Sequence, residues 1–228
     1  MELQLSLEYY ADQDFESNVK RLDALVTKQP FAYHLDVMRR GCTAKDRMTD
    51  RQYDFVIENV TRPIDAHVML PNPAANIGRY IDPRLRSLVF QMEAAHSDGE
   101  IMKILDHIKR LGVKAGVCID APTAINKQVA AIIRNCDVVT LLGIKMAESG
   151  TPLRPETLAK IQQVRKINPN IRVIWDGGVR LENLDLFKGA DNCVIATAVF
   201  KVADQKAAIE QLQAKINQIS TSNPPRNP

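Results

Sequence analysis

The sequence lacks the features that mark membrane, exported and disulfide-bonded proteins. No apolar run in its 228 residues approaches the roughly 18 residues that a membrane-spanning helix needs. The first residues do not form the charged and then apolar segment of an export signal. The four cysteines are scattered and share no spacing typical of zinc sites or disulfides. We therefore expect a cytoplasmic protein with reduced thiols and no membrane partner.

Features of nucleic-acid-binding and dinucleotide-binding proteins are missing too. The formal net charge is only +3, and no basic run is interleaved with aromatic residues, so we expect no nucleic-acid partner. No Gly-x-Gly-x-x-Gly or phosphate-loop signature follows any early strand-like segment. The hydrophobic fraction of 45% and the charged fraction of 25% are ordinary values for a globular protein.

Strand-like and helix-like segments alternate along almost the whole chain. The expected strands cover residues 3–8, 31–38, 64–70, 85–93, 114–120, 138–145, 171–176 and 192–198. The expected helices cover residues 14–28, 50–60, 73–81, 100–111, 124–135, 154–166, 181–188 and 205–219.

This alternation predicts an α/β fold, a single-domain (β/α)8 TIM barrel over residues 1–220, because about 27 residues separate successive units. An open doubly wound sheet is the alternative, and the missing glycine signature argues against it. Residues 221–228 are polar and proline-rich, so we expect a disordered tail there.

Histidines and acids recur at the ends of the expected strands. His34 and Asp36 are two residues apart and so share one strand face, while His67 and Asp176 lie near the ends of two other strands. In a barrel these ends converge on one mouth, so the four side chains are candidate ligands of a divalent cation. The alternative is a buried histidine bonded to a nearby carboxylate. Asp65 is either a partner of a ligand or a buried structural acid.

Four segments give the chain a family resemblance that extends over nearly its whole length. They are HLDVM at 34–38, DAHVM at 65–69, WDGGV at 175–179 and VIATAVF at 194–200. Together they resemble the ribulose-phosphate 3-epimerase family of barrel enzymes, whose pattern runs H-x-D-x-M, D-x-H-x-M, D-G-G and G-S-A-x-F. This family acts on sugar phosphates, so the resemblance implies a sugar-phosphate substrate.

The resemblance implies an isomerase that inverts the hydroxyl-bearing carbon next to the ketone of a ketose phosphate, such as D-ribulose 5-phosphate or D-xylulose 5-phosphate. It assigns the metal ligands to His34, Asp36, His67 and Asp176, and the cofactor to one divalent metal, Zn, Fe(II), Mn or Co. It makes Asp36 and Asp176 the catalytic acid and base, which act through an enediolate. It also implies a homo-oligomer.

The same resemblance implies which residues contact the substrate. Met38 and Met69 form an apolar lining, and the amides of Gly177 and Gly178 bind the phosphate, although a simple strand-to-helix turn is the alternative for the glycine pair. The full expected set is Ser6, Met38, His67, Met69, Gly150, Gly177, Gly178, Ala196 and Thr197.

Several positions depart from the family pattern. Arg39-Arg40 replaces an Asp-Gly pair, Gln91 replaces a histidine, and the normally glycine-rich loop at 145–151 keeps only Gly150. We expect retained chemistry on an altered substrate. The two arginines either favour a more anionic ligand or form a solvated, partner-facing pair.

Two other functions stay open. Lys145 at the end of an expected strand suits a Schiff-base aldolase. Loss of the glycine-rich loop suits a non-catalytic relative that binds a phosphosugar.

Overall fold

Eight parallel strands close into a barrel in the computed structural model, which describes residues 1–25, 30–147 and 150–221. Neighbouring strands follow chain order, and β1 also pairs with β8 to close the ring. The strands are β1 (Glu2–Ser6), β2 (Phe31–Met38), β3 (Ile64–Met69), β4 (Leu85–Gln91), β5 (Lys114–Ile119), β6 (Val138–Leu142), β7 (Arg172–Asp176) and β8 (Asn192–Ile195). The expected TIM barrel is confirmed.

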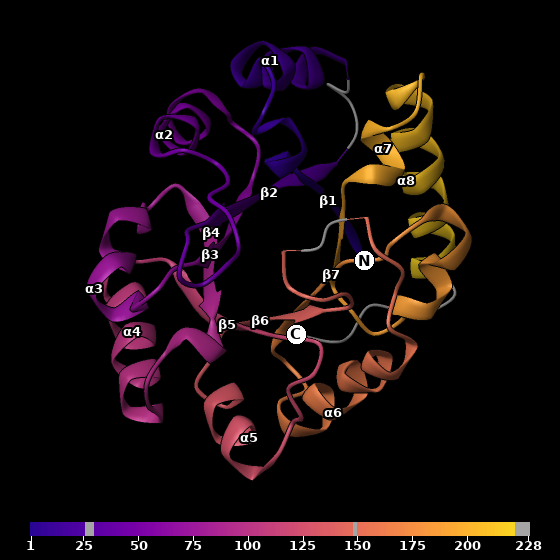
Figure 1. Ribbon diagram of the computed structural model, residues 1–228. Helices are drawn as coiled ribbons and strands as arrows, with labels where there is room; N and C mark the ends of the chain where they lie inside the picture. Colours follow the sequence, from indigo (N-terminus) through magenta and orange to yellow (C-terminus); the bar gives the residue numbers. More distant parts are fainter. Residues whose placement is uncertain (26–29, 148–149, 222–228) are drawn as a thin grey trace.

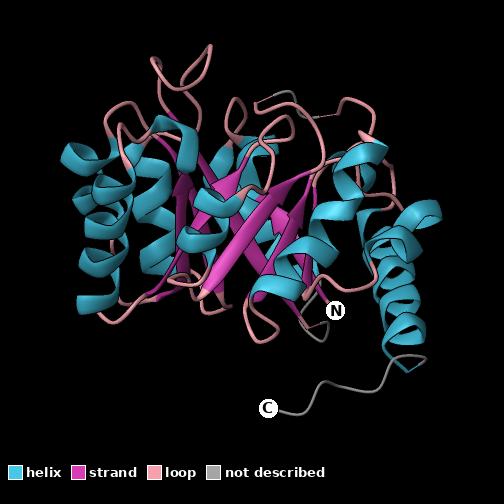
Figure 2. Cartoon of the chain, turned by 90° about the horizontal axis from the view of Figure 1, so that it is seen from below, coloured by secondary structure: helices cyan, strands magenta, loops and turns pink. Residues whose placement is uncertain are grey.

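Helices surround the strands on all sides (Figure 1), and the side view shows the strands enclosed between them (Figure 2). The α-helices are α1 (Phe15–Leu25), α2 (Asp50–Asn59), α3 (Pro73–Asn76), α4 (Asp98–Arg110), α5 (Lys127–Ile133), α6 (Ala159–Ile167), α7 (Thr197–Phe200) and α8 (Gln205–Thr221). The 3-10 helices are η1 (Leu7–Tyr10), η2 (Ile77–Tyr80), η3 (Met92–Ala94), η4 (Pro155–Leu158) and η5 (Leu181–Phe187). No helix in the described part of the chain has the length and apolar character to cross a membrane.

The strands form where both faces of a segment are buried. Every residue of β2 and of β3 is buried, which is the pattern of a parallel strand with the barrel interior on one side and helices on the other. Capping fixes the starts of several helices. The Thr49 side chain accepts from the Gln52 amide at the start of α2, and the Ser97 side chain caps α4 in the same way.

Four of the expected strands end two or three residues earlier than the apolar pattern suggested. β1 ends at Ser6, β4 at Gln91, β6 at Leu142 and β8 at Ile195. The chain then enters a turn or short helix whose apolar residues still pack on the core, so the pattern of buried residues continues although the strand has stopped. The early end of β8 places Thr197 on α7 instead of on a strand.

Some helix expectations are also corrected. The expected helix 73–81 is one α-helical turn followed by η2, and the expected helix 181–188 is the 3-10 helix η5. Thr221, expected in the tail, is the last residue of α8. The end of the expected helix 14–28 and the expected tail at 222–228 lie outside the described residues.

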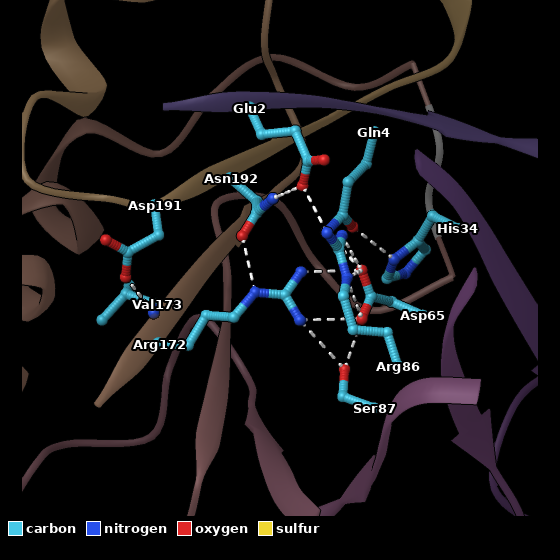
Figure 3. A network of polar contacts seen from close by, with 10 residues as sticks. All are labelled: Glu2, Gln4, His34, Asp65, Arg86, Ser87, Arg172, Val173, Asp191 and Asn192. Carbon is cyan, nitrogen blue, oxygen red and sulfur yellow. Dashed lines mark hydrogen bonds and ion pairs between the residues drawn. The ribbon is translucent and has the colours of Figure 1, made fainter. Parts of the chain in front are cut away.

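Below the mouth, a buried network of polar side chains closes the barrel floor (Figure 3). Asp65 accepts two hydrogen bonds from Arg172, at 2.8 and 2.7 Å, and others from Arg86, Ser87 and Gln4. Burial alone would raise the pKa of Asp65, but the two guanidinium groups outweigh it and hold the pKa well below its usual range. Asp65 is therefore the structural acid of the two alternatives, and among the described side chains Gln4 links its carboxylate to His34.

Candidate metal and substrate site

The four predicted ligands meet at the barrel mouth. One ligand atom from each of His34, Asp36, His67 and Asp176 lies within 4.8 Å of the others. The register explains this meeting, because Asp36 on β2 is paired with His67 on β3 and each side chain points inward. Asp36 Oδ1 lies between the imidazoles, 3.3 Å from His34 Nε2 and 3.5 Å from His67 Nδ1.

Two glutamines hold the histidines from outside. His34 Nδ1 is 3.0 Å from the side-chain oxygen of Gln4, and His67 Nε2 is 3.1 Å from that of Gln91. Each glutamine amide nitrogen donates to a carboxylate, Asp65 for Gln4 and Glu93 for Gln91. The glutamine oxygens therefore accept from the imidazoles, which fixes where each ring carries its N–H.

The inner nitrogens fit a cation. His34 Nε2 and His67 Nδ1 are buried, and neither has a hydrogen-bond partner within the described chain. Burial lowers the pKa of His34, but the Asp36 carboxylate outweighs this and raises it to about 9. Two imidazoles and two carboxylates match the donors that Zn, Fe(II), Mn and Co prefer. The residues present therefore suit the divalent metal that the resemblance implied.

The two aspartates differ strongly in acidity. Burial alone would raise the pKa of Asp36, but His34 and His67 outweigh it and hold that pKa far below its usual range. Burial, and then the negative charge of Asp36, raise the pKa of Asp176 to about 6. The Ser6 hydroxyl donates to Asp36 Oδ2 at 2.7 Å. A charged carboxylate and a protonatable one thus stand side by side, as proton transfer in two directions requires.

A pocket opens above this centre. All nine expected substrate-contacting residues lie on its wall: Ser6, Met38, His67, Met69, Gly150, Gly177, Gly178, Ala196 and Thr197. Asp36 and Asp176 reach the pocket too, whereas His34 is fully buried beneath it. A substrate in this pocket therefore meets both carboxylates directly.

Gly177 and Gly178 take backbone conformations that other residues rarely adopt, with φ of +103° and +72°. A β-carbon on Gly177 would lie 2.5 Å from Ile144, and one on Gly178 would lie 2.8 Å from Leu153. This turn, together with Ala196 and Thr197 at the end of β8, forms one side of the pocket. We call these four residues the β7–β8 cup.

Two charged wall residues were not anticipated from the sequence. Glu8 follows β1, and Arg180 follows the Gly177-Gly178 turn. Glu8 was expected inside a strand, where alternation gives no hint that η1 aims it at the pocket. Arg180 directly follows the WDGGV segment, so its position was the one signal that could have identified it.

Of the two alternatives for Arg39 and Arg40, the structure does not support the ligand-binding one, and the exposed Arg40 fits the solvated one. The Arg39 guanidinium donates to the carbonyls of Met38, Arg47 and Met48, so it holds the following loop together. Arg40 is exposed and pairs with Asp46 at 3.6 Å. Neither arginine is among the described residues of the pocket wall, so neither supports a more anionic ligand.

Known proteins resemble this chain in sequence. The model described as "Ribulose-phosphate 3 epimerase family" matches residues 9–200. The chain is 27% identical over 171 residues to ribulose-phosphate 3-epimerase of Buchnera aphidicola subsp. Schizaphis graminum, covering 72% of this chain and 73% of the relative. It is 26% identical over 167 residues to ribulose-phosphate 3-epimerase of Escherichia coli K12, covering 71% and 72%.

Solved structures share the fold. A 3-keto-L-gulonate-6-phosphate decarboxylase from Vibrio cholerae O1 superposes with a TM-score of 0.70 at 13% identity, covering 96% of this chain and 98% of the other. A 3-hexulose-6-phosphate synthase from Salmonella typhimurium gives 0.69 at 11% identity, covering 96% and 100%. The structures support the barrel alone. The match over residues 9–200 shows that this chain belongs to the ribulose-phosphate 3-epimerase family, a family of isomerases.

Proposed function

We propose that the protein is a sugar-phosphate 3-epimerase that interconverts D-ribulose 5-phosphate and D-xylulose 5-phosphate or a related pair of ketose phosphates. The observation that carries this proposal is the pair of carboxylates that line one pocket, Asp36 with a lowered pKa and Asp176 with a raised one. Relatives named ribulose-phosphate 3-epimerase support the substrate class.

The two aspartates divide the work of inverting one carbon. A charged Asp36 removes the proton beside the ketone, and a protonated Asp176 returns one to the opposite face, which gives the epimer through an enediolate. The roles exchange in the reverse direction. Ser6 orients Asp36 through its hydrogen bond, and Met38 and Met69 keep water from the reactive intermediate.

The quartet of His34, Asp36, His67 and Asp176 would hold one divalent metal, Zn, Fe(II), Mn or Co. When bound, it would stabilise the negative charge that develops on the substrate oxygens. Gln4 and Gln91 keep the inner histidine nitrogens free for this role.

The β7–β8 cup would bind the phosphate. Barrel enzymes often place phosphate after strands 7 and 8, and glycine lets backbone amides approach an anion. Thr197 adds a hydroxyl, and Gly150 lies close to the Thr197 side chain. Arg180 adds a positive charge beside the cup. We also propose that the protein is a homo-oligomer, on the family resemblance. We propose that it is cytoplasmic, because its four cysteines are free. Light scattering of the purified protein tests the assembly.

Proton exchange tests the reaction. Ketopentose and ketohexose phosphates are incubated with the protein in deuterated water, and NMR follows the carbon beside the carbonyl. We expect deuterium uptake with at least one substrate, and loss of at least about 10²-fold in rate in both Asp36→Asn and Asp176→Asn. Asp106→Asn, at an exposed ion pair on α4, is the control and keeps the rate. Absence of exchange with every substrate overturns the proposal.

Two other functions have their own tests. Lys145 lies on the pocket wall, which keeps the Schiff-base aldolase open as a second candidate. Borohydride reduction with a ketose phosphate decides it, because only the aldolase gives a covalent adduct on Lys145. A protein that purifies without divalent metal, and whose melting temperature is unchanged when metal is added, supports the non-catalytic relative.

A further inference from the structure

A third carboxylate faces the pocket beside the catalytic pair. Glu8 follows β1, two residues after Ser6, and its side chain is only 12% exposed. It lies on the same pocket wall as Ser6 and Asp36. The proposed chemistry uses Asp36 and Asp176 and gives Glu8 no proton to move. We therefore consider Glu8 as a residue that binds substrate.

Arg47 holds this carboxylate in place. Its Nε lies 3.0 Å from Glu8 Oε1, and the Arg47 side chain is itself 16% exposed. The same guanidinium also pairs with Asp12. The Arg47 backbone is fixed as well, since its N–H donates to the Met38 carbonyl and its carbonyl accepts from the Met38 amide. An ion pair with an arginine whose own backbone is held restricts the positions of the Glu8 carboxylate, and a restricted group loses less entropy when it binds a ligand.

The pocket carries groups of both charges. Glu8 follows β1, which pairs with β2 on one side and with β8 on the other, and its partner Arg47 lies in the loop after β2. The β7–β8 cup and Arg180 provide the side that attracts an anion. A phosphate dianion at the cup leaves the hydroxyl-bearing end of a sugar phosphate for the rest of the pocket, which Glu8, Asp36 and Asp176 line. Arg47 offsets part of the negative charge of Glu8 but is not among the described residues that line the pocket.

We infer that Glu8 accepts a hydrogen bond from a hydroxyl at the end of the substrate distant from the phosphate, and that it rejects phosphorylated sugar acids, which carry a carboxylate there. This inference rests on the proposed function, since it assumes a sugar phosphate in the pocket. A carboxylate accepts a hydrogen bond from a hydroxyl group, and it repels another carboxylate that lies at hydrogen-bonding distance. Glu8 therefore determines specificity and is not a catalytic residue.

A matched pair of unreactive ligands tests the inference. Xylitol 5-phosphate ends in a hydroxymethyl group and xylonate 5-phosphate in a carboxylate, and neither has a ketone to epimerise. Calorimetry measures both dissociation constants with the metal-loaded protein. In Glu8→Gln we expect xylonate 5-phosphate to bind about tenfold tighter, as relief of about 1.4 kcal/mol of repulsion gives. Xylitol 5-phosphate should change by less than about threefold.

Control variants separate charge from shape. Glu8→Asp keeps the charge and should keep the wild-type ratio of the two constants. Glu182→Gln removes a carboxylate from the neighbouring hollow that Arg180 also borders, and should leave the ratio unchanged. Glu8→Ser supplies a second neutral variant should Glu8→Gln fail to fold.

The outcomes separate failure of the Glu8 inference from failure of the epimerase proposal. A ratio that does not move in the neutral Glu8 variants overturns this inference and leaves the epimerase proposal standing. If wild-type protein binds neither ligand, the proposal of a sugar-phosphate site falls and this inference falls with it. A tenfold shift confined to xylonate 5-phosphate supports Glu8 even if no substrate is epimerised.

Discussion

At the scale of single residues, the glutamines behind the two histidines matter as much as the histidines. Gln4 accepts a hydrogen bond from the outer nitrogen of His34, and Gln91 accepts one from that of His67. The two rings therefore offer different nitrogens, Nε2 and Nδ1, to the centre. The family pattern has a histidine where this chain has Gln91. The amide still accepts from His67, so the replacement keeps the orientation of the ring.

We expect Gln4→Leu and Gln91→Leu to weaken divalent metal binding about tenfold to 100-fold, because each frees an imidazole to turn or to change tautomer. Titration calorimetry with Zn²⁺ or Mn²⁺ measures the change. Gln213→Leu is the control, since Gln213 is also buried but lies on α8. Unchanged affinity in both test variants would show that the histidines need no such support.

Arg180 offers a second residue-scale prediction. Its guanidinium forms no ion pair with a described carboxylate, so its charge is available to a ligand at the cup. Arg180→Ala should raise the KM for the preferred sugar phosphate about tenfold and change kcat little, because the phosphate does not react. Arg110→Ala, exposed on α4, should leave both constants unchanged. A fall in kcat alone would contradict a binding role.

At the scale of elements, the turn after β7 is shaped by glycine. Gly178→Ala should destabilise the protein by about 2–4 kcal/mol, through left-handed strain and through the clash with Leu153. Gly112 has a similar φ of +83° but nothing within 4 Å of an added β-carbon, so Gly112→Ala should cost only about 1 kcal/mol. Urea unfolding measures both. Equal losses would show that strain alone, without the clash, determines the cost.

The elements also show how far sequence reasoning reaches. β2 was predicted at its observed bounds, because an apolar run buried on both faces stands out between polar segments. The end of β1 was misplaced because Leu7 and Tyr10 remain buried after the strand has become η1. Apolar periodicity reports burial, and it does not report where backbone pairing stops.

In the site, too, the residues on strands were predicted better than those on irregular backbone. His34, Asp36, His67 and Asp176 were identified because ligand-type side chains at strand ends converge in a barrel and match a family pattern. Glu8 was missed because its direction depends on a turn that the sequence did not reveal. The sequence also left two alternatives open for Arg39 and Arg40, for a related reason.

Arg39 illustrates that reason. A charge beside a strand end looks available to a ligand, but the loop that follows brings three carbonyl oxygens to the Arg39 guanidinium. Nothing in the residue types of that loop indicates how it folds back. Contacts made by irregular backbone are therefore the part of this site that sequence alone leaves open.

At the scale of the whole molecule, the floor network links stability to pH. The pKa of Asp65 is lowered in the fold, so its contribution is complete above the ordinary value of 3.8 and is lost as the pH falls below it. Asp65→Asn should destabilise the protein by about 3–5 kcal/mol at pH 7, because the partly buried Arg172 and Arg86 lose the carboxylate that they share, although Arg86 keeps its ion pair with Glu2. The difference in the free energy of unfolding between wild type and Asp65→Asn should be smaller at pH 3 than at pH 7.

Urea titrations at pH 7 and pH 3 measure both differences. Asp106→Asn, which breaks an exposed pair with Arg110, should stay within about 1 kcal/mol of wild type at either pH. A gap for Asp65→Asn that stays constant with pH would mean that its carboxylate is not charged in the folded protein.

The closed floor also leaves one doorway. His34 and His67 are at most 1% exposed, and the polar network of Figure 3 lies on the floor side of His34. Within the described part of the barrel, an ion held by the quartet would therefore exchange with solvent through the mouth that substrate enters. A bound sugar phosphate would then act as a stopper. Stripping of the ion by a chelator, followed by stopped-flow absorbance with a metal indicator, should slow in proportion to the occupancy of the pocket by xylitol 5-phosphate. Stripping at an undiminished rate would reveal a second route through the barrel.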